Sequence, residues 1–212
     1  MLQSDQALGR RERNKLEKQT RIFDAAAELF HEKGYGAVTT QEISDRADIA
    51  SGTLFRYAAS KTELLLMVYN SEYRTQIEIG EAAEIGATSP EDRVIQLVSP
   101  LMGSSRINNE NTGIYQREVL FGEPNACYRT EGVELTKRLQ ARIERILAES
   151  FPNVAALHTT TAARTISNVL HFEIARGALE SISVQSLLNT VAAQVKLIAL
   201  GLRTLSTKEE QK

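Results

Sequence analysis

The sequence is poor in the residues from which many reactive sites are built. Its 212 residues include one cysteine, Cys127, and three histidines, His31, His158 and His171. A single cysteine excludes a disulfide within the chain and suits a reducing compartment, so we expect a cytoplasmic protein. The histidines do not have the spacing of metal ligands, and Cys127 joins them in no familiar pattern. We therefore expect neither a metal nor a cofactor.

Membrane-spanning segments and common enzyme motifs are also missing. No apolar run is long enough to cross a bilayer, and the charged N-terminal residues lack the core of a signal peptide. Gly34 and Gly36 do not begin a dinucleotide loop, because Thr39 stands where the third glycine should be. There is no Walker loop and no nucleophile elbow. We expect a protein that is not an enzyme and does not enter a membrane; an all-helical enzyme would need a pocket of convergent titratable groups.

Charge is distributed unevenly along the chain. The formal net charge is −2, which gives no sign of nucleic acid binding by the whole chain. Residues 10–21, however, contain six basic and two acidic residues, whereas the chain from Thr62 onward has 15 basic and 18 acidic residues. A basic leader on a mildly acidic body fits a protein that meets a polyanion at one end. A solvated helical tail explains the leader equally well, so its contact with DNA stays open at this point.

Helical periodicity dominates the sequence, and no β-hairpin pattern is visible. The spacing predicts an all-α chain with a polar loop over 103–113, and with Pro100 kinking or ending the helix that contains it. The expected helices cover residues 15–33, 40–47, 51–57, 61 to about 80, 90–97, 114–121, 128–151, 161–179 and 184–205.

Residues 39–65 have the pattern of a helix-turn-helix. Thr39 and Glu42 form a capping box that begins one short helix, and Asp48 tolerates the turn that ends it. A second short helix follows from Ser51, and Ser60 caps a third, longer helix. Two short helices joined by a tight turn let the second helix enter the major groove of DNA.

This stretch resembles the DNA-binding core of the TetR family of bacterial transcriptional regulators. The residues that match the family pattern are Thr39, Thr40, Ile43, Ala47, Ser51, Gly52, Thr53, Leu54, Phe55, Tyr57, Ser60, Lys61 and Leu64. Residues 22–35 resemble the first helix of the family. Asp48, Ala50 and Ala58 depart from the pattern: they replace a turn glycine, a Ser/Thr cap and an aromatic residue. The resemblance implies a three-helix DNA-binding domain (1–61) followed by a helical ligand-binding and dimerisation domain (62–212).

The predicted DNA contacts follow from the motif and the resemblance together. The free N–H groups at Ser51 and Gly52 favour a phosphate, and Arg56 can read a guanine edge. A cation in the first turn of a helix is unfavourable for the helix dipole, which favours a phosphate contact for Lys61 over a role in stability. The predicted DNA-binding residues are Thr40, Gln41, Ser51, Gly52, Thr53, Phe55, Arg56, Tyr57 and Lys61.

The resemblance also implies an unidentified small-molecule effector that binds in the helical body. Its candidate ligands should be partly polar residues on inner faces, although each of them also fits an ordinary core or surface position. They are Met102, Tyr115, Arg117, Phe121, Tyr128, Asn168, His171 and Phe172. His171 is the first to test, against the alternative of a core histidine paired with a neighbour.

The last two helices, 161–179 and 184–205, have apolar residues at helix-bundle spacing. A monomer core explains the second pattern as well as a subunit interface does, and the resemblance favours a homodimer formed through both helices. We thus expect a DNA-binding regulator, a repressor released from a pseudo-palindromic operator by its effector. The alternative is a helical adaptor that binds protein through residues 184–205 and responds to no ligand.

Overall fold

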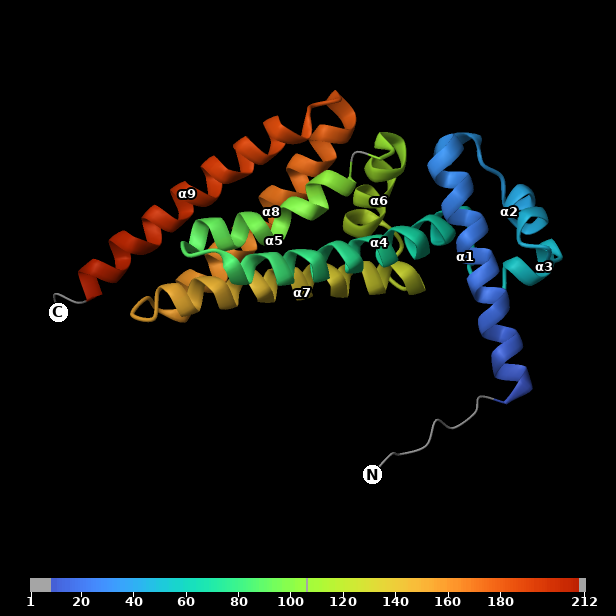
Figure 1. Cartoon of the computed structure of the whole chain (residues 1–212), viewed down its shortest axis with the longest axis horizontal. Coiled ribbons are helices and arrows are strands. Elements are labelled where there is room, and N and C mark those ends of the chain that lie inside the picture. Colours follow the sequence, from blue (N-terminus) through green and yellow to red (C-terminus); the bar gives the residue numbers. More distant parts are fainter. Residues whose placement is uncertain (1–8, 106, 210–212) are drawn as a thin grey trace. The chain divides into compact units, whose positions relative to one another are not determined.

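The computed structural model describes residues 9–105 and 107–209, and every regular element in these ranges is a helix. The chain divides into two compact units, one on each side of the bond between Val68 and Tyr69 (Figure 1). This division lies inside helix α4 (Lys61–Ala83), whereas the expected boundary at residue 61 marks the start of that helix. The all-α fold class expected from the sequence is confirmed.

The first unit contains α1 (Arg10–Ala37), α2 (Thr40–Arg46), α3 (Ser51–Leu54) and the first residues of α4. The residues predicted to form its core are buried: Ile22, Ala26, Leu29, Phe30, Ile43, Ala47, Leu64, Leu65 and Val68. Helix α1 begins earlier than residue 15, and at Gly34, where we expected the helix to stop, the backbone leaves the helical conformation with a φ of 77°. This φ lies in the left-handed region, where glycine has no steric penalty.

The start and the end of α2 follow the local signals in the sequence. The Thr39 side chain accepts a hydrogen bond from the Glu42 N–H, and the Glu42 carboxylate accepts one from the Thr39 N–H at 2.8 Å. Hydrogen bonds from Lys33 and Thr39 lower the pKa of Glu42 to about 2. The turn residue Asp48 has a φ of 52°, a conformation that aspartate adopts more readily than most residues. Both predictions about this turn are confirmed.

Ion pairs join α1 to the helix-turn-helix. Arg46 contacts Glu28 at 2.7 Å, and Arg21 contacts Asp48 at 3.3 Å. All four side chains are largely exposed, so each pair contributes about 0–1 kcal/mol. The buried apolar residues, rather than these pairs, hold the unit together.

The second unit contains the rest of α4, the 3-10 turn η1 (Glu84–Gly86), α5 (Pro90–Ser104), α6 (Asn109–Phe121), α7 (Cys127–Ser150), α8 (Ala156–Glu180) and α9 (Val184–Glu209). Helix α8 packs against α6, α7 and α9, and α5 packs against α9 and α7. Helix α7 runs beside α4 (Figure 1), and Asn70 of α4 donates a hydrogen bond to the Tyr128 carbonyl oxygen at 2.7 Å. Among the described residues, no helix has both the length and the apolar character needed to cross a bilayer.

The polar loop predicted over 103–113 is wrong. Helix α5 continues past Pro100 to Ser104, and α6 begins at Asn109 with Asn108 as its cap. The asparagines of this stretch suggested a loop, but the Asn108 side chain accepts from the Asn111 N–H at 3.1 Å. Asparagine is favoured at such a cap, and tertiary burial outweighs its weak helix propensity in the turns that follow.

Gly80 allows two helices to approach closely instead of ending α4. A Cβ atom at this position would overlap the backbone carbonyl of Leu97 on α5. The helix continues through Gly80 as far as Ala83, beyond the end that we expected from the sequence.

Candidate nucleic-acid interface and effector groove

The recognition segment after the turn is exposed, as a DNA-reading element must be. Helix α3 is shorter than the predicted 51–57, because Arg56 and Tyr57 donate to carbonyls three residues back rather than four. Leu54 is fully buried and anchors the segment, while Gly52, Phe55 and Arg56 are exposed. None of the nine predicted DNA-binding residues is buried.

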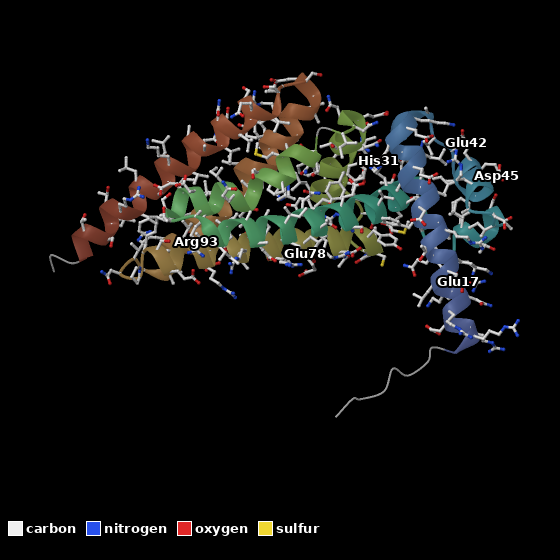
Figure 2. The ribbon with its side chains drawn as sticks, in the orientation of Figure 1. Glu17, His31, Glu42, Asp45, Glu78 and Arg93 are labelled. Atoms are coloured by element: carbon white, nitrogen blue, oxygen red, sulfur yellow. The ribbon has the colours of Figure 1, made fainter. Side chains whose placement is uncertain are left out.

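Two of the predicted contacts hold the motif in shape. The Ser51 hydroxyl donates to Gln41 Oε1 at 2.7 Å, and Gln41 Nε2 donates to Asp45 Oδ1 at 2.7 Å. Asp45 and Glu42 belong to α2 (Figure 2). Gln41 therefore links α2 to α3, and its amide is already engaged before any base approaches.

Phe55 and Arg56 are available for contact with DNA. Phe55 is 49 % exposed, so its ring can contact DNA. The side chain of Arg56 makes no ion pair or hydrogen bond with any described residue. An arginine in this state can donate two hydrogen bonds to a guanine edge or to a phosphate.

Lys61 has a structural role that the sequence argument did not give it. Its Nζ donates to the carbonyl oxygens of Tyr35 and Val38, both at 2.8 Å, and lies 4.2 Å from the centre of the Tyr35 ring. The preference for a phosphate contact over a stability role was therefore wrong, since the ammonium ties the start of α4 to the α1–α2 connection. One of its three donors remains for a phosphate, so that contact stays a prediction.

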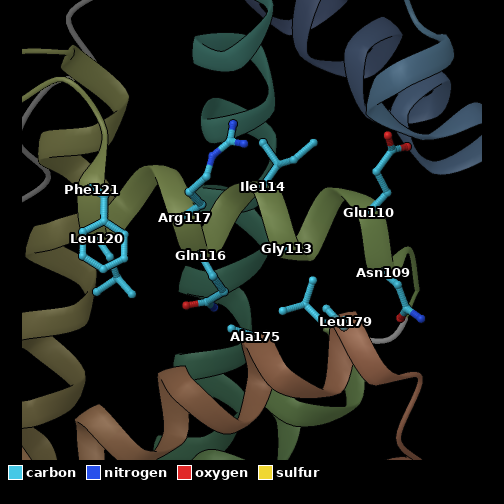
Figure 3. Close-up of a pocket in the computed structure, with 11 residues that line it drawn as sticks. Asn109, Glu110, Gly113, Ile114, Gln116, Arg117, Leu120, Phe121, Ala175 and Leu179 are labelled. Carbon is cyan, nitrogen blue, oxygen red and sulfur yellow. The ribbon is translucent and has the colours of Figure 1, made fainter.

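In the second unit, α6 and α8 border a groove of about 540 Å³ (Figure 3). Its lining residues are Asn109, Glu110, Gly113, Ile114, Gln116, Arg117, Leu120, Phe121, Ala175, Ala178 and Leu179. The Gln116 side chain points from α6 toward α8, while those of Glu110 and Arg117 point away from α8. The face between the two helices is thus mainly apolar, with Gln116 as its central polar group.

Behind the groove lies a buried polar cluster. His171 Nδ1 is 2.8 Å from Gln116 Oε1, and the Gln116 side chain also borders a small inner cavity of about 30 Å³ that Tyr73 and Tyr115 help to line. Burial lowers the pKa of His171 to about 4, so the ring is neutral at pH 7. Its Nε2 and the Tyr73 hydroxyl have no hydrogen-bond partner among the described residues. Buried polar atoms in native proteins are nearly always paired, so these two atoms could bind a ligand or a water molecule.

Comparison with known proteins agrees with this arrangement. The family profile described as "Bacterial regulatory proteins, tetR family" matches residues 22–68. The transcriptional repressor KstR of Mycobacterium tuberculosis is 32% identical over 154 residues, which cover 72% of this chain and 67% of the relative. KstR of Mycolicibacterium smegmatis is 30% identical over 72% of each chain. The chain belongs to the TetR family.

The fold of most of the chain also matches a solved regulator. The Bacillus subtilis regulator FadR, solved in complex with stearoyl-CoA, has a TM-score of 0.64 and 20% identity, and the match covers 84% of this chain and 97% of that one. This TetR-family protein is therefore a DNA-binding transcriptional regulator, with a helix-turn-helix unit followed by a helical body.

The eight candidate effector contacts of this TetR-family protein are not all on inner faces. Met102, Tyr115 and His171 are buried, and Tyr128 is half-buried. The inner-face prediction is wrong for the exposed residues Arg117, Phe121, Asn168 and Phe172. Arg117 and Phe121 do line the α6–α8 groove, whereas Asn168 and Phe172 lie on the solvent side of α8.

Sequence reasoning missed the residue at the centre of the groove. The predicted loop over 103–113 includes the first turn of α6. The sequence therefore did not indicate which side of this helix faces α8, and Gln116 was not among the candidates. Tyr73 was missed because its position on α4 gave no polar signal. In a helix capped by Asn108, Gly113 and Gln116 are three residues apart and therefore lie on the same face.

Proposed function

We propose that this protein is a homodimeric transcriptional repressor that a small effector releases from its operator. The exposed recognition segment, with the Arg56 side chain unpaired among the described residues and Leu54 buried beneath it, supports DNA binding most directly. Two such segments held about one helical turn apart fit successive major grooves of a pseudo-palindrome. A bacterial protein with this task works in the cytoplasm, where the DNA is.

The dimer is proposed to form through α8 and α9. Each of these helices is apolar on a face that the protomer leaves exposed: Phe172 and Leu179 of α8 are 66% and 82% exposed, and Leu197 and Leu200 of α9 are 69% and 57% exposed. Leu187, Val191, Val195 and Leu202 of α9 are buried in the protomer instead. Helix α9 thus has one apolar face for its own body and a second for a partner. Large exposed apolar patches mark interaction sites.

Light scattering on Leu197→Glu tests this dimer. We expect a monomer, because a carboxylate would be buried without a partner at the interface. Lys196→Glu is the matched control, since Lys196 is exposed on the same helix but one residue away from the apolar stripe. The proposed interface is refuted if both variants remain dimers at micromolar concentration.

The effector is proposed to bind along the α6–α8 groove and to reach Gln116 and the cluster behind it. A volume of about 540 Å³ lies within the range of small-molecule sites, which are mainly apolar with a few polar groups that fix orientation. If Nδ1 of His171 donates to Gln116, the free Nε2 is an acceptor, and the Tyr73 hydroxyl is a donor. These groups suit an uncharged oxygen, a hydroxyl or a carbonyl, on an apolar skeleton.

A charged head group fits this inner cluster poorly. Burial raises the pKa of Tyr73 and of Tyr115 above the ordinary value, and the nearby Arg74 is already paired with Glu131. An unpaired carboxylate there would face a desolvation cost of several kcal/mol. An acyl-CoA, the ligand of the FadR neighbour, would therefore have to keep its phosphates outside the cluster.

Tyr73→Phe isolates the effector contact from folding. The hydroxyl has no hydrogen-bond partner among the described residues, so its removal should leave the free energy of unfolding unchanged or slightly higher. A thermal-shift screen with alcohols, ketones and carboxylates of matched carbon skeleton should favour the neutral compounds. The phenylalanine variant should bind the best of them about tenfold more weakly. Equal binding by both proteins would remove Tyr73 from the site.

The mechanism requires only that the effector prefer one arrangement of the dimer over another. Its differential affinity for the two states equals the loss of DNA affinity, typically about 1–3 kcal/mol. Selection of genomic fragments on the purified protein, repeated with the screened compounds, tests the whole proposal. An inverted-repeat consensus that disappears with one compound is expected. A dimer that selects no DNA would favour the protein-binding adaptor.

A further inference from the structure

A second groove lies within the DNA-binding unit, between the N-terminal half of α1 and the recognition segment. It has a volume of about 370 Å³. Its lining residues are Arg11, Asn14, Lys15, Lys18, Thr53, Arg56 and Tyr57. Three of these, Thr53, Arg56 and Tyr57, are predicted to contact DNA, so the groove continues the surface that the recognition segment presents.

Helical spacing brings together three of the four cations that line this groove. Arg11, Lys15 and Lys18 are separated by four and three residues, which places them on one face of α1, and Arg56 comes from the turn after α3. Among the residues that the structure describes, no carboxylate lines the groove; Glu17 (Figure 2) lies on α1 outside it. The four cations make no ion pair with any residue that the structure describes.

The part of α1 that carries these cations covers none of the buried core of the unit. The first buried residue of α1 is Ile22, so the helical turns before it have no core to cover. Like charges four residues apart on a helix are destabilising, and Arg56 adds a further positive charge opposite them. An anion bound in the groove would supply the missing opposite charge.

The shape and position of the groove favour DNA backbone over a small anion. From Arg11 to Lys18 the helix rises by about 10 Å. One DNA strand has a phosphate every ~3.4 Å along its axis, so about three phosphates fit beside this face. A duplex that contacts Arg56 also comes close to the groove, because Arg56 and Tyr57 line it.

We propose that Arg11, Lys15 and Lys18 form, together with Arg56, a cradle for the phosphates of the operator backbone. The inference rests on the proposed DNA binding and extends it. The basic helix adds contacts that do not depend on sequence, and base recognition stays with α2, α3 and the turn after α3. Arg56 then stands at the junction between the cradle and the base edges.

Two matched double variants of the full chain test the cradle. Lys15→Ala/Lys18→Ala removes two charges from the groove, and Arg10→Ala/Arg13→Ala removes two charges from residues of α1 that do not line it. All four side chains are exposed, so both variants should keep the helix content and melting temperature of the parent. The probes are the duplex recovered by fragment selection and a scrambled duplex of the same composition.

Fluorescence anisotropy over a salt series gives the decisive numbers. Two lost phosphate contacts should lower the slope of log K against log salt by about 1.8 and weaken binding about 30-fold at 0.15 M salt. The groove variant should lose this affinity equally for both duplexes and keep the operator-to-scrambled ratio of the parent. The control variant should lose less than about threefold, through long-range charge alone.

The outcomes separate the two proposals. If the parent prefers the selected duplex and the two double variants weaken binding equally, net charge explains the effect and the cradle is refuted. If neither variant weakens binding, the cradle is likewise refuted while the regulator assignment stands. A parent that prefers no duplex at all overturns the proposed function and the cradle with it.

Discussion

Gly52 offers a test in which folding and DNA binding should change in opposite directions. It is the second residue of α3, it has an ordinary helical backbone, and a Cβ built on it would meet no atom within 4 Å. The protein itself therefore has no need of glycine at this position. A helix gains about 0.5–1 kcal/mol when an interior glycine becomes alanine, and somewhat less near its end.

Gly52→Ala should accordingly raise the melting temperature by a few degrees or leave it unchanged, since ~1 kcal/mol corresponds to about 2–4 °C in a chain of this size. If the backbone of DNA approaches the start of α3, the added methyl group should lower operator affinity about tenfold, or 1.4 kcal/mol. Urea unfolding and anisotropy on the selected duplex measure the two effects.

Gly103→Ala in α5 is the matched control, because a Cβ there also meets open space but lies in the other unit. It should leave operator affinity unchanged. Unaltered affinity for Gly52→Ala, with the protein folded, would refute the close approach of DNA to this residue.

Three further predictions concern single residues of the two units. Lys61→Met should lower the free energy of unfolding by about 1–3 kcal/mol in urea titrations, because two backbone carbonyls lose their donor; an unchanged midpoint would contradict the role seen for Lys61. Arg56→Ala should relax preference at one base pair per half-site in a selection experiment, and an unchanged consensus would show that Arg56 reads no base. The pKa of His171 is about 4 when folded and 6.5 in its ordinary state, so the unfolded chain binds the extra proton and stability falls as pH drops through this window. Between pH 7 and pH 5 the parent should lose roughly 2 kcal/mol of unfolding free energy through His171, and His171→Gln should lose none of this amount. Parallel pH profiles of the unfolding free energy for the two proteins would refute the prediction.

Local signals predicted the DNA-binding unit closely. The capping box at Thr39, the turn at Asp48 and the buried face of α1 depend on residues a few positions apart, and the structure confirms each of them. The recognition segment is exposed because Leu54 is the apolar anchor of a short stretch whose other residues have no core to reach. Such features are fixed by backbone preferences and short-range periodicity, which the sequence displays directly.

Tertiary structure decided three features, one in the DNA-binding unit and two in the helical body. In the sequence, Asn108 fits a loop and a helix cap equally well. Burial of the helical turn that follows it makes Asn108 a cap. Lys61 became a structural donor because the α1–α2 connection folds back onto it from more than twenty residues away. Gln116 and His171 meet from α6 and α8 across 55 positions of sequence. Pairings of this kind arise from how helices pack against one another, and the periodicity of a single helix does not contain that information.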